Sequence, residues 1–330
     1  MFKSWYFFAT CFALFFKTGF CDGQDPASST NYSLEMDQEA SSYVQAMALN
    51  AEALRSSDVL VRFESFHDIG PEQYIRIVTL MRMRMDRLSE KMFVLKRMER
   101  RTRQTNEEEQ RIVSLEGFQF EDQNLRVTQF TGPVSRKKLS FKDAAIYTSL
   151  TDLRFVGLKP FPTRSSPLGS FDEYLAASKI LTKCVLQSVD TKNVEINRSI
   201  STVNAPDEFI HTCWRFNTVT LLPSRFRKEI RRKESGMPVV YPTCRESYSW
   251  EETNGAFVPT RIDGVEPGNL KNVEGGKPIK YQIENTAQFH WFSVNEQMDN
   301  KLFSADPLDS FGDCFPLLDP KLSNATTIVE

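Results

Sequence analysis

The clearest pattern in the chain is an alternation of apolar and polar residues between Ile75 and Asp86. The odd-numbered positions are mostly apolar, and most of the even-numbered positions are charged. The odd-numbered residues are Ile75, Ile77, Thr79, Met81, Met83 and Met85, and the charged even-numbered residues are Arg76, Arg82, Arg84 and Asp86. A period of two puts neighbours on opposite faces of a β-strand, whereas helical spacing winds them around one axis. The pattern predicts a long strand with one dry and one solvated face.

Shorter extended runs lie on both sides of this strand, most of them separated by a few residues. They cover 58–64, 91–98, 111–120, 125–130, 139–147, 153–158, 194–200, 209–222 and 239–241. Strands so close in sequence favour an antiparallel meander over βαβ units. The charged stretch 96–109 is expected to form a solvated hairpin tip.

The strongest turn signal is Asn254-Gly255, which separates the extended runs 247–253 and 256–262. Asn and Gly tolerate the two positive φ angles of a type I′ turn, so the pair predicts a hairpin. Alternation returns at 279–284 and leads into an aromatic run that ends at Asn295. This last stretch is predicted to be a strand as well.

Two helices are predicted. In 39–57, Val44, Met47, Ala51 and Leu54 recur at a spacing of three to four residues. The second helix, 170–183, begins with a Ser cap followed by Glu three residues later. Together these elements predict an α+β, β-dominated fold, in which one curved, half-barrel-like antiparallel sheet carries an N-terminal helix and a mid-chain helix.

The beginning of the chain differs from the rest. A basic start is followed by about twelve largely apolar residues, Trp5 to Phe16, then by a break that ends at Cys21, after which the chain turns polar at once. This is the pattern of a cleaved signal peptide, and Phe20 disfavours lipidation of Cys21 because a small residue normally precedes a lipidated Cys. We therefore expect four parts: signal peptide 1–21, flexible polar segment 22–37, a single curved-sheet domain 38–318 and a flexible tail 319–330.

Cleavage leaves 39 basic and 43 acidic residues, a net charge of −4. That balance is too mild to indicate nucleic-acid binding. No later stretch has eighteen consecutive apolar residues, so the mature chain is not expected to span a membrane. The expected location is the periplasm or the outside of the cell.

Catalytic and metal-binding motifs are absent from the sequence, so neither an enzyme nor a cofactor or metal is predicted. His67 and His290 lack convergent partners and are interpreted as structural. His211-Thr-Cys213 puts His and Cys on one face of a strand, where a strand residue beside a structural Cys is the favoured interpretation and a ligand pair or reactive dyad is the alternative. Four Cys remain after the leader: Cys184, Cys213, Cys244 and Cys314. They could pair into disulfides in three different ways.

Two groups of residues are candidates for binding. The apolar face of the 75–85 strand is either ordinary core or the lining of a groove for an acyl chain, and Met makes such a surface adaptable. The lining candidates are Ile77, Met81, Met83, Met85, Tyr281 and Ile283. A basic run is either a solvated edge or a contact for anionic lipid or polysaccharide of the cell envelope: Arg225, Arg227, Lys228, Arg231, Arg232 and Lys233.

The order of elements, with the hairpin motif Trp250…Asn254-Gly255…Val258-Pro259 and Asn295 after the next strand, resembles the periplasmic lipoprotein carrier (LolA-like) half-barrel superfamily and uncharacterised exported bacterial proteins. The resemblance covers about residues 39–305, and this chain is longer and more charged between strands. It implies a sheet curved around helices that holds lipid or acyl chains without catalysis.

The leading hypothesis is therefore an exported, non-enzymatic protein that binds a lipid-like ligand in the concave face of the sheet. The alternative is a structural or interaction protein of the cell envelope without a ligand. A third hypothesis, an exported hydrolase, requires His211 or two of the scattered acids to converge in a cleft.

Overall fold

The computed structural model describes residues 38–105, 107–129, 134–141, 143–144, 153, 156–157, 161, 184–202, 205–234, 237–270 and 279–304. The chain divides into two compact units, 1–34 and 35–330, and every described residue belongs to the second. The predictions for the signal peptide 1–21, the segment 22–37, the helix 170–183 and the tail 319–330 lie outside the described residues.

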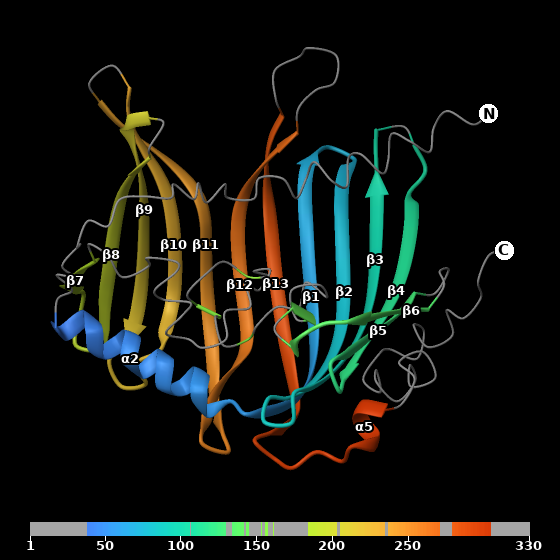
Figure 1. Cartoon of the computed structure of the whole chain (residues 1–330). Coiled ribbons are helices and arrows are strands. Elements are labelled where there is room, and N and C mark those ends of the chain that lie inside the picture. Colours follow the sequence, from blue (N-terminus) through green and yellow to red (C-terminus); the bar gives the residue numbers. More distant parts are fainter. Residues whose placement is uncertain are drawn as a thin grey trace. The chain divides into compact units, whose positions relative to one another are not determined.

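In the described part of the chain, thirteen strands form one antiparallel sheet in the order β6-β5-β4-β3-β2-β1-β13-β12-β11-β10-β9-β8-β7 (Figure 1). The strands are β1 (Ser56–Gly70), β2 (Gln73–Asp86), β3 (Lys91–Arg103), β4 (Gln110–Glu121), β5 (Asn124–Gln129), β6 (Ser135–Lys138), β7 (Cys184–Ser188), β8 (Asn193–Thr202), β9 (Ala205–Asn217), β10 (Pro223–Glu234), β11 (Met237–Thr253), β12 (Ala256–Leu270) and β13 (Ile279–Val294). The sheet is curved and unclosed, with β6 and β7 as its edges. The first and last strands pair with each other in its centre.

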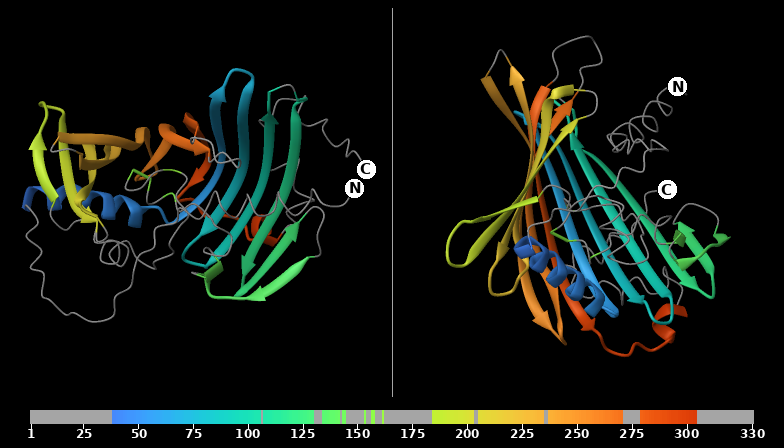
Figure 2. Two further views of the ribbon diagram at one scale, coloured as in Figure 1. Left: turned by 90° about the horizontal axis from the view of Figure 1, so that it is seen from above. Right: turned by 60° about the vertical axis from the view of Figure 1, so that its left-hand side comes forward.

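The predicted fold class is confirmed. The N-terminal helix α2 (Gln38–Ala53) ends four residues before the predicted boundary, because β1 already begins at Ser56. A second short helix, α5 (Lys301–Ser304), was not predicted. Figure 2 shows α2 lying across the concave side of the curved sheet.

The two faces of the sheet bury different side chains. The α2 face, which we define as the face of Val59 and Val61, carries the main apolar core together with Tyr43, Met47 and Ala51 of α2. The α5 face carries a smaller cluster under α5: Leu60, Leu80, Phe93, Leu95 and Phe303. Each large apolar side chain fully buried in these cores stabilises the fold by about 1.5–3 kcal/mol relative to exposure.

The prediction that one face of β2 is solvated is wrong for Arg82 and Arg84. Arg82 and Arg84 do alternate with the Met residues, but they are only 4 % and 7 % exposed. Both pair with Asp58 on β1, with Arg82 Nε at 2.6 Å, and the Arg82 guanidinium lies 3.3 Å from the centre of the Phe292 ring. A paired charge can be buried where an unpaired one cannot, and alternation alone does not reveal the pairing.

The charged hairpin tip is shorter than predicted, because β3 continues through Arg103. Glu99, placed in the tip by the prediction, and Arg97, where the predicted strand and tip overlap, are buried within the sheet. Glu99 accepts hydrogen bonds from Arg97, Arg101 and Arg111 at 2.8–3.1 Å. Cross-strand ion pairs thus let a charged sequence continue as a strand.

Two further strand predictions are corrected by local side-chain hydrogen bonds. In the predicted run 139–147, Ser140 instead begins a helical turn, in which it accepts from the Asp143 amide and its carbonyl accepts from Ala144. In 209–222, the Asn217 side chain accepts from the amides of Val219 and Thr220 and ends β9 in a turn. Asn and Ser compete with strand pairing in this way.

The Asn254-Gly255 hairpin is confirmed, with positive φ angles of 47° and 76°. The Asn254 side chain donates to the Val294 carbonyl, and Asn295 donates back to the Asn254 carbonyl. Asn295 also accepts from the Arg55 amide just before β1. The hairpin motif therefore joins the beginning of the sheet to its last strand.

Candidate functional site: the α2 face of the sheet

All six predicted lining residues lie on the α2 face. The register places Ile283 beside His67, and Met81 beside Val61, so the candidates share one face of the neighbouring strands β13, β1 and β2. Met81, Met83 and Met85 occupy the end of the sheet near α2, and Ile77, Tyr281 and Ile283 occupy the opposite end. The structure therefore brings the six candidates onto one surface.

The two ends of this surface differ in their contact with the main core. Met83 is 3 % exposed inside the main core, and Met81 and Met85 are half-buried against it. Ile77 and Ile283 are also half-buried, but they are not part of that core cluster. The Met end is thus packed, while the Ile end forms a partly open rim.

Tyr281 is positioned by the absence of a side chain at Gly268. A Cβ atom there would lie 2.2 Å from the Tyr281 ring. The His67 ring lies 5.8 Å from the Tyr281 ring, and Ser65 Oγ is 3.1 Å from His67 Nε2. Burial and the Arg100 guanidinium lower the pKa of His67 to about 4, so His67 is neutral at pH 7.

The connection between the two edge strands contributes to the centre of the α2 face. Described residues of this connection, Ala144, Val156 and Phe161, are buried in the main core. The Phe161 ring lies 5.7 Å from Phe63 and 5.6 Å from Phe289. Since β6 and β7 lie at opposite edges of the sheet, the chain covers part of its own concave face on the way between them.

Phe161 is held there by a buried carboxylate that the sequence did not indicate. Its amide donates to Glu246 Oε1 at 2.6 Å, and the Tyr248 hydroxyl donates to Oε2 at 2.6 Å. Burial raises the pKa of Glu246 to about 7, although both hydrogen bonds favour the ionised form. No local pattern marks Glu246, because its backbone partner lies 85 residues away in sequence.

Two of the four cysteines, Cys213 and Cys244, lie among the residues whose side chains the structure describes. Cys213 and Cys244 are free and buried, and they lie on opposite faces of the sheet. Burial raises the pKa of Cys213 to about 11 and that of Cys244 further, so both remain protonated at neutral pH. The Cys184 side chain and Cys314 lie outside the described residues.

The His211 and His290 side chains each contact a neighbouring side chain of the sheet. His211 shares its face of β9 with Cys213, but its hydrogen-bond partner is Ser199, with Oγ 2.9 Å from Nδ1. Burial and the Arg231 charge lower the pKa of His211. The His290 ring packs at 4.6 Å against Phe292. Among the described residues, no group of three His, Cys, Asp or Glu side chains could hold a metal ion.

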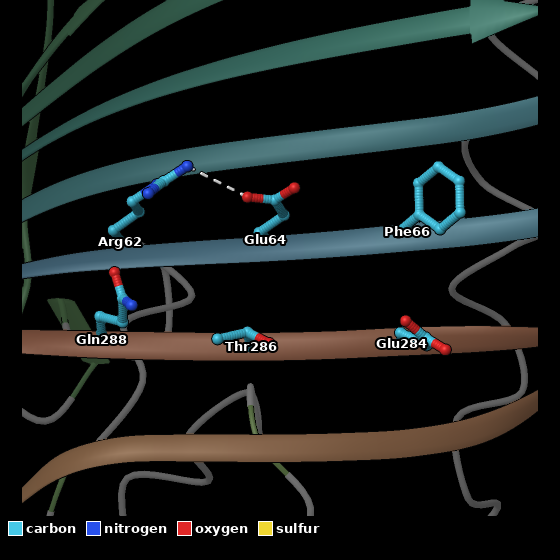
Figure 3. Close-up of a pocket in the computed structure, with 6 residues that line it drawn as sticks. All are labelled: Arg62, Glu64, Phe66, Glu284, Thr286 and Gln288. Carbon is cyan, nitrogen blue, oxygen red and sulfur yellow. Dashed lines mark hydrogen bonds and ion pairs between the residues drawn. The ribbon is translucent and has the colours of Figure 1, made fainter. Parts of the chain in front are cut away.

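The α5 face carries two surface hollows with charged linings among the described residues. The first, of about 260 Å³, is lined by β1 and β13 (Figure 3): Arg62, Glu64, Phe66, Glu284, Thr286 and Gln288. Arg62 contacts Glu64 along β1 at 3.2 Å, and Glu64 also binds Arg76 of β2. The second, of about 270 Å³, lies over β8 to β11. The predicted apolar lining residues belong to neither hollow.

The basic run is divided by its own strand. β10 alternates, so Arg225, Arg227 and Arg231 point to the α5 face and Lys228 and Arg232 to the α2 face. The Lys233 side chain lies outside the described residues. Acidic residues pair with several of these cations: Glu229 with Arg227 and Arg231, and Glu208 with Arg232. The run therefore does not form one continuous patch. The alternation of its charged residues with Phe226 and Ile230 is the sequence signal for this division between two faces.

Within the described residues, no helix is long and apolar enough to cross a membrane. No protein-family model matches the chain. No curated protein matches it either.

Several solved structures are similar to this chain. A domain described as an outer membrane lipoprotein-sorting protein from Vibrio parahaemolyticus matches with 8 % identity and a TM-score of 0.29, over 79 % of this chain and 95 % of that one. A beta-barrel-like protein of a domain of unknown function from Brucella abortus matches with 8 % identity and a TM-score of 0.25, over 73 % and 100 %. A porin-like protein from Bacteroides uniformis matches with 8 % identity and a TM-score of 0.24, over 72 % and 98 %.

The first of these structures is of the class that the sequence resembles. At such identities and TM-scores the likenesses carry no argument about function. The functional argument therefore rests on the residues of this chain.

Proposed function

We propose that this chain is an exported, non-enzymatic protein that binds a lipid-like ligand on the α2 face of its curved sheet. The observation that carries the proposal is the placement of the six lining candidates on one face of β13, β1 and β2, where Ile77, Tyr281 and Ile283 form a half-buried rim outside the main core. Ligand sites of this kind are concave, mostly apolar and supplied with few polar groups.

Two features of the sheet support such binding. Its edges β6 and β7 do not pair, so the concave side is not closed into a barrel. The Met81–Met83–Met85 row can repack around an entering chain, because Met has three flexible bonds and no branch. Export is proposed from the composition of residues 1–21 alone.

The proposal is tested by titrating purified protein with a fluorescent fatty acid and by native mass spectrometry of protein from its own host. We expect the double variant Ile77→Asn, Ile283→Asn to bind about tenfold more weakly, since two half-buried apolar contacts are lost. Val265→Asn is the matched control, because Val265 is an exposed apolar residue on the opposite face. Equal binding by all three proteins, with no co-purifying lipid, overturns the proposal.

A second function is favoured by one observation. Met83 and Phe161 are fully packed in the main core, so the middle of the α2 face already holds the protein's own side chains. A structural or interaction protein of the cell envelope needs no cavity there. It predicts that no apolar ligand binds and that the rim variants change only stability.

A further inference from the structure

The second hollow, on the α5 face over β8 to β11, is surrounded by four arginines. They come from three neighbouring strands: Arg215 of β9, Arg225 and Arg227 of β10, and Arg245 of β11. Alternation along each strand turns all four to the α5 face, away from the core residues Trp214 and Phe226. The hollow has a volume of about 270 Å³.

The four arginines oppose one another directly across the strands. Arg225 pairs in register with Arg215, and Arg227 pairs in register with Arg245. Side chains at directly opposite positions have Cβ atoms about 4.5–5.5 Å apart, and like charges there destabilise a sheet. Two such pairs side by side indicate that the arrangement serves an anion.

The local carboxylates neutralise only half of this charge. Arg215 binds Glu195 at 2.9 Å, and Arg227 lies 3.3 Å from Glu229. Among the described residues, Arg225 and Arg245 have no ion pair, and both are exposed. The Glu246 carboxylate, although its residue borders the hollow, binds Tyr248 and Phe161 on the other face. An excess of two positive charges remains.

We propose that this hollow, the arginine hollow, binds the dianionic phosphate group of a phosphorylated ligand. Two unpaired guanidinium groups match the charge of a phosphate monoester, and each can donate two parallel hydrogen bonds to its oxygens. The site lies on the face opposite to the proposed apolar site and does not depend on it. The phosphate can belong to a lipid headgroup or to a soluble phosphate ester.

Two probes separate these sources at constant ionic strength. Inorganic phosphate is titrated by calorimetry, and flotation measures binding to phosphatidylcholine vesicles with and without phosphatidic acid. The wild-type protein is expected to bind at least one probe, and the double variant Arg225→Gln, Arg245→Gln to bind it about tenfold more weakly or not at all. Binding of the vesicles containing phosphatidic acid assigns a lipid headgroup, and binding of inorganic phosphate alone assigns a soluble ester.

Arg261→Gln is the control, since Arg261 is an exposed arginine on the same face that already pairs with Asp263 at 2.6 Å. It changes the net charge but lies outside the arginine hollow. Circular dichroism and thermal melting establish that each variant is folded, which is expected because both replaced residues are exposed. If the wild type binds neither probe, or if Arg261→Gln weakens binding as much per charge removed, the proposal is wrong.

Discussion

At the scale of single residues, the α2 face contains two titratable groups, Glu246 and His67, that no sequence motif marks. Glu246 and His67 both lose water on folding, and burial moves their pKa values in opposite directions. The sequence showed that His67 lacks nearby partners, and it gave no reason to select Glu246 from 43 acidic residues. Desolvation depends on what packs over a group, and Phe161 reaches Glu246 from a distant part of the chain.

Glu246 makes a testable contribution to the pH dependence of stability. Its pKa rises from 4.5 to about 7 on folding, so the folded protein holds a proton that the unfolded chain has lost. The related stabilisation is complete below about pH 4.5 and disappears as the pH rises through 7, a change of about 3 kcal/mol. We expect Glu246→Gln to remove this decline in the free energy of unfolding, measured with urea between pH 5 and 8.

Glu251→Gln, an exposed position on the same strand, is the control and should leave the pH dependence of wild type unchanged. A Glu246→Gln protein with the same decline as wild type would show that the carboxylate does not titrate in this range.

At the scale of elements, a buried ion-pair cluster decides where β3 ends. β3 continues through Arg103 because Glu99 is surrounded by arginines of its own strand and of β4. Burial by itself would raise the pKa of Glu99, but hydrogen bonds from Arg111 and Arg101 outweigh it and lower the pKa to about 2. Alternation predicted the strand type correctly, while its length depended on charges from a neighbouring strand.

Replacing Glu99 by Gln should destabilise the protein by about 3–5 kcal/mol, because Arg97 would remain buried without its counter-charge. The free energy of unfolding in urea at pH 7 measures this loss. Glu116→Gln serves as the comparison. The Glu116 side chain is 36 % exposed and its carboxylate lies as far as 4.0 Å from Lys96 Nζ, so the loss of stability should stay below about 1 kcal/mol. Similar losses in both variants would contradict a special role for Glu99.

At the scale of the whole molecule, the sheet depends on a pairing between the first and last strands. The chain moves from β1 at the centre to the edge β6, crosses to the opposite edge β7, and returns to the centre with β13. β1 and β13 meet across more than 200 residues of sequence, as in the pair Leu60 and His290. Such long-range pairing makes folding slow and cooperative.

Removal of residues 279–330 should therefore unfold or aggregate the whole protein, because β1 and β12 would become long unpaired edges. A chain that ends at Ser304 keeps all thirteen strands and is the matched control. Far-ultraviolet circular dichroism and tryptophan fluorescence should give coincident urea transitions in the control and none in the truncated chain. A truncated protein with a stable half-sheet would show that the two halves fold independently.

The sequence alone determined the properties that depend on neighbouring residues. Period-two alternation identified the strands, three-to-four spacing identified α2, and Asn254-Gly255 identified the hairpin, because each is set by local backbone geometry. The same alternation placed the six lining candidates on one face. The tertiary structure decided which side chains are covered: the pairing of Asp58 with Arg82, the packing of Phe161 against Glu246, and the gathering of four arginines around one hollow. These depend on residues far apart in the chain, and burial and charge compensation arise only when the fold brings them together.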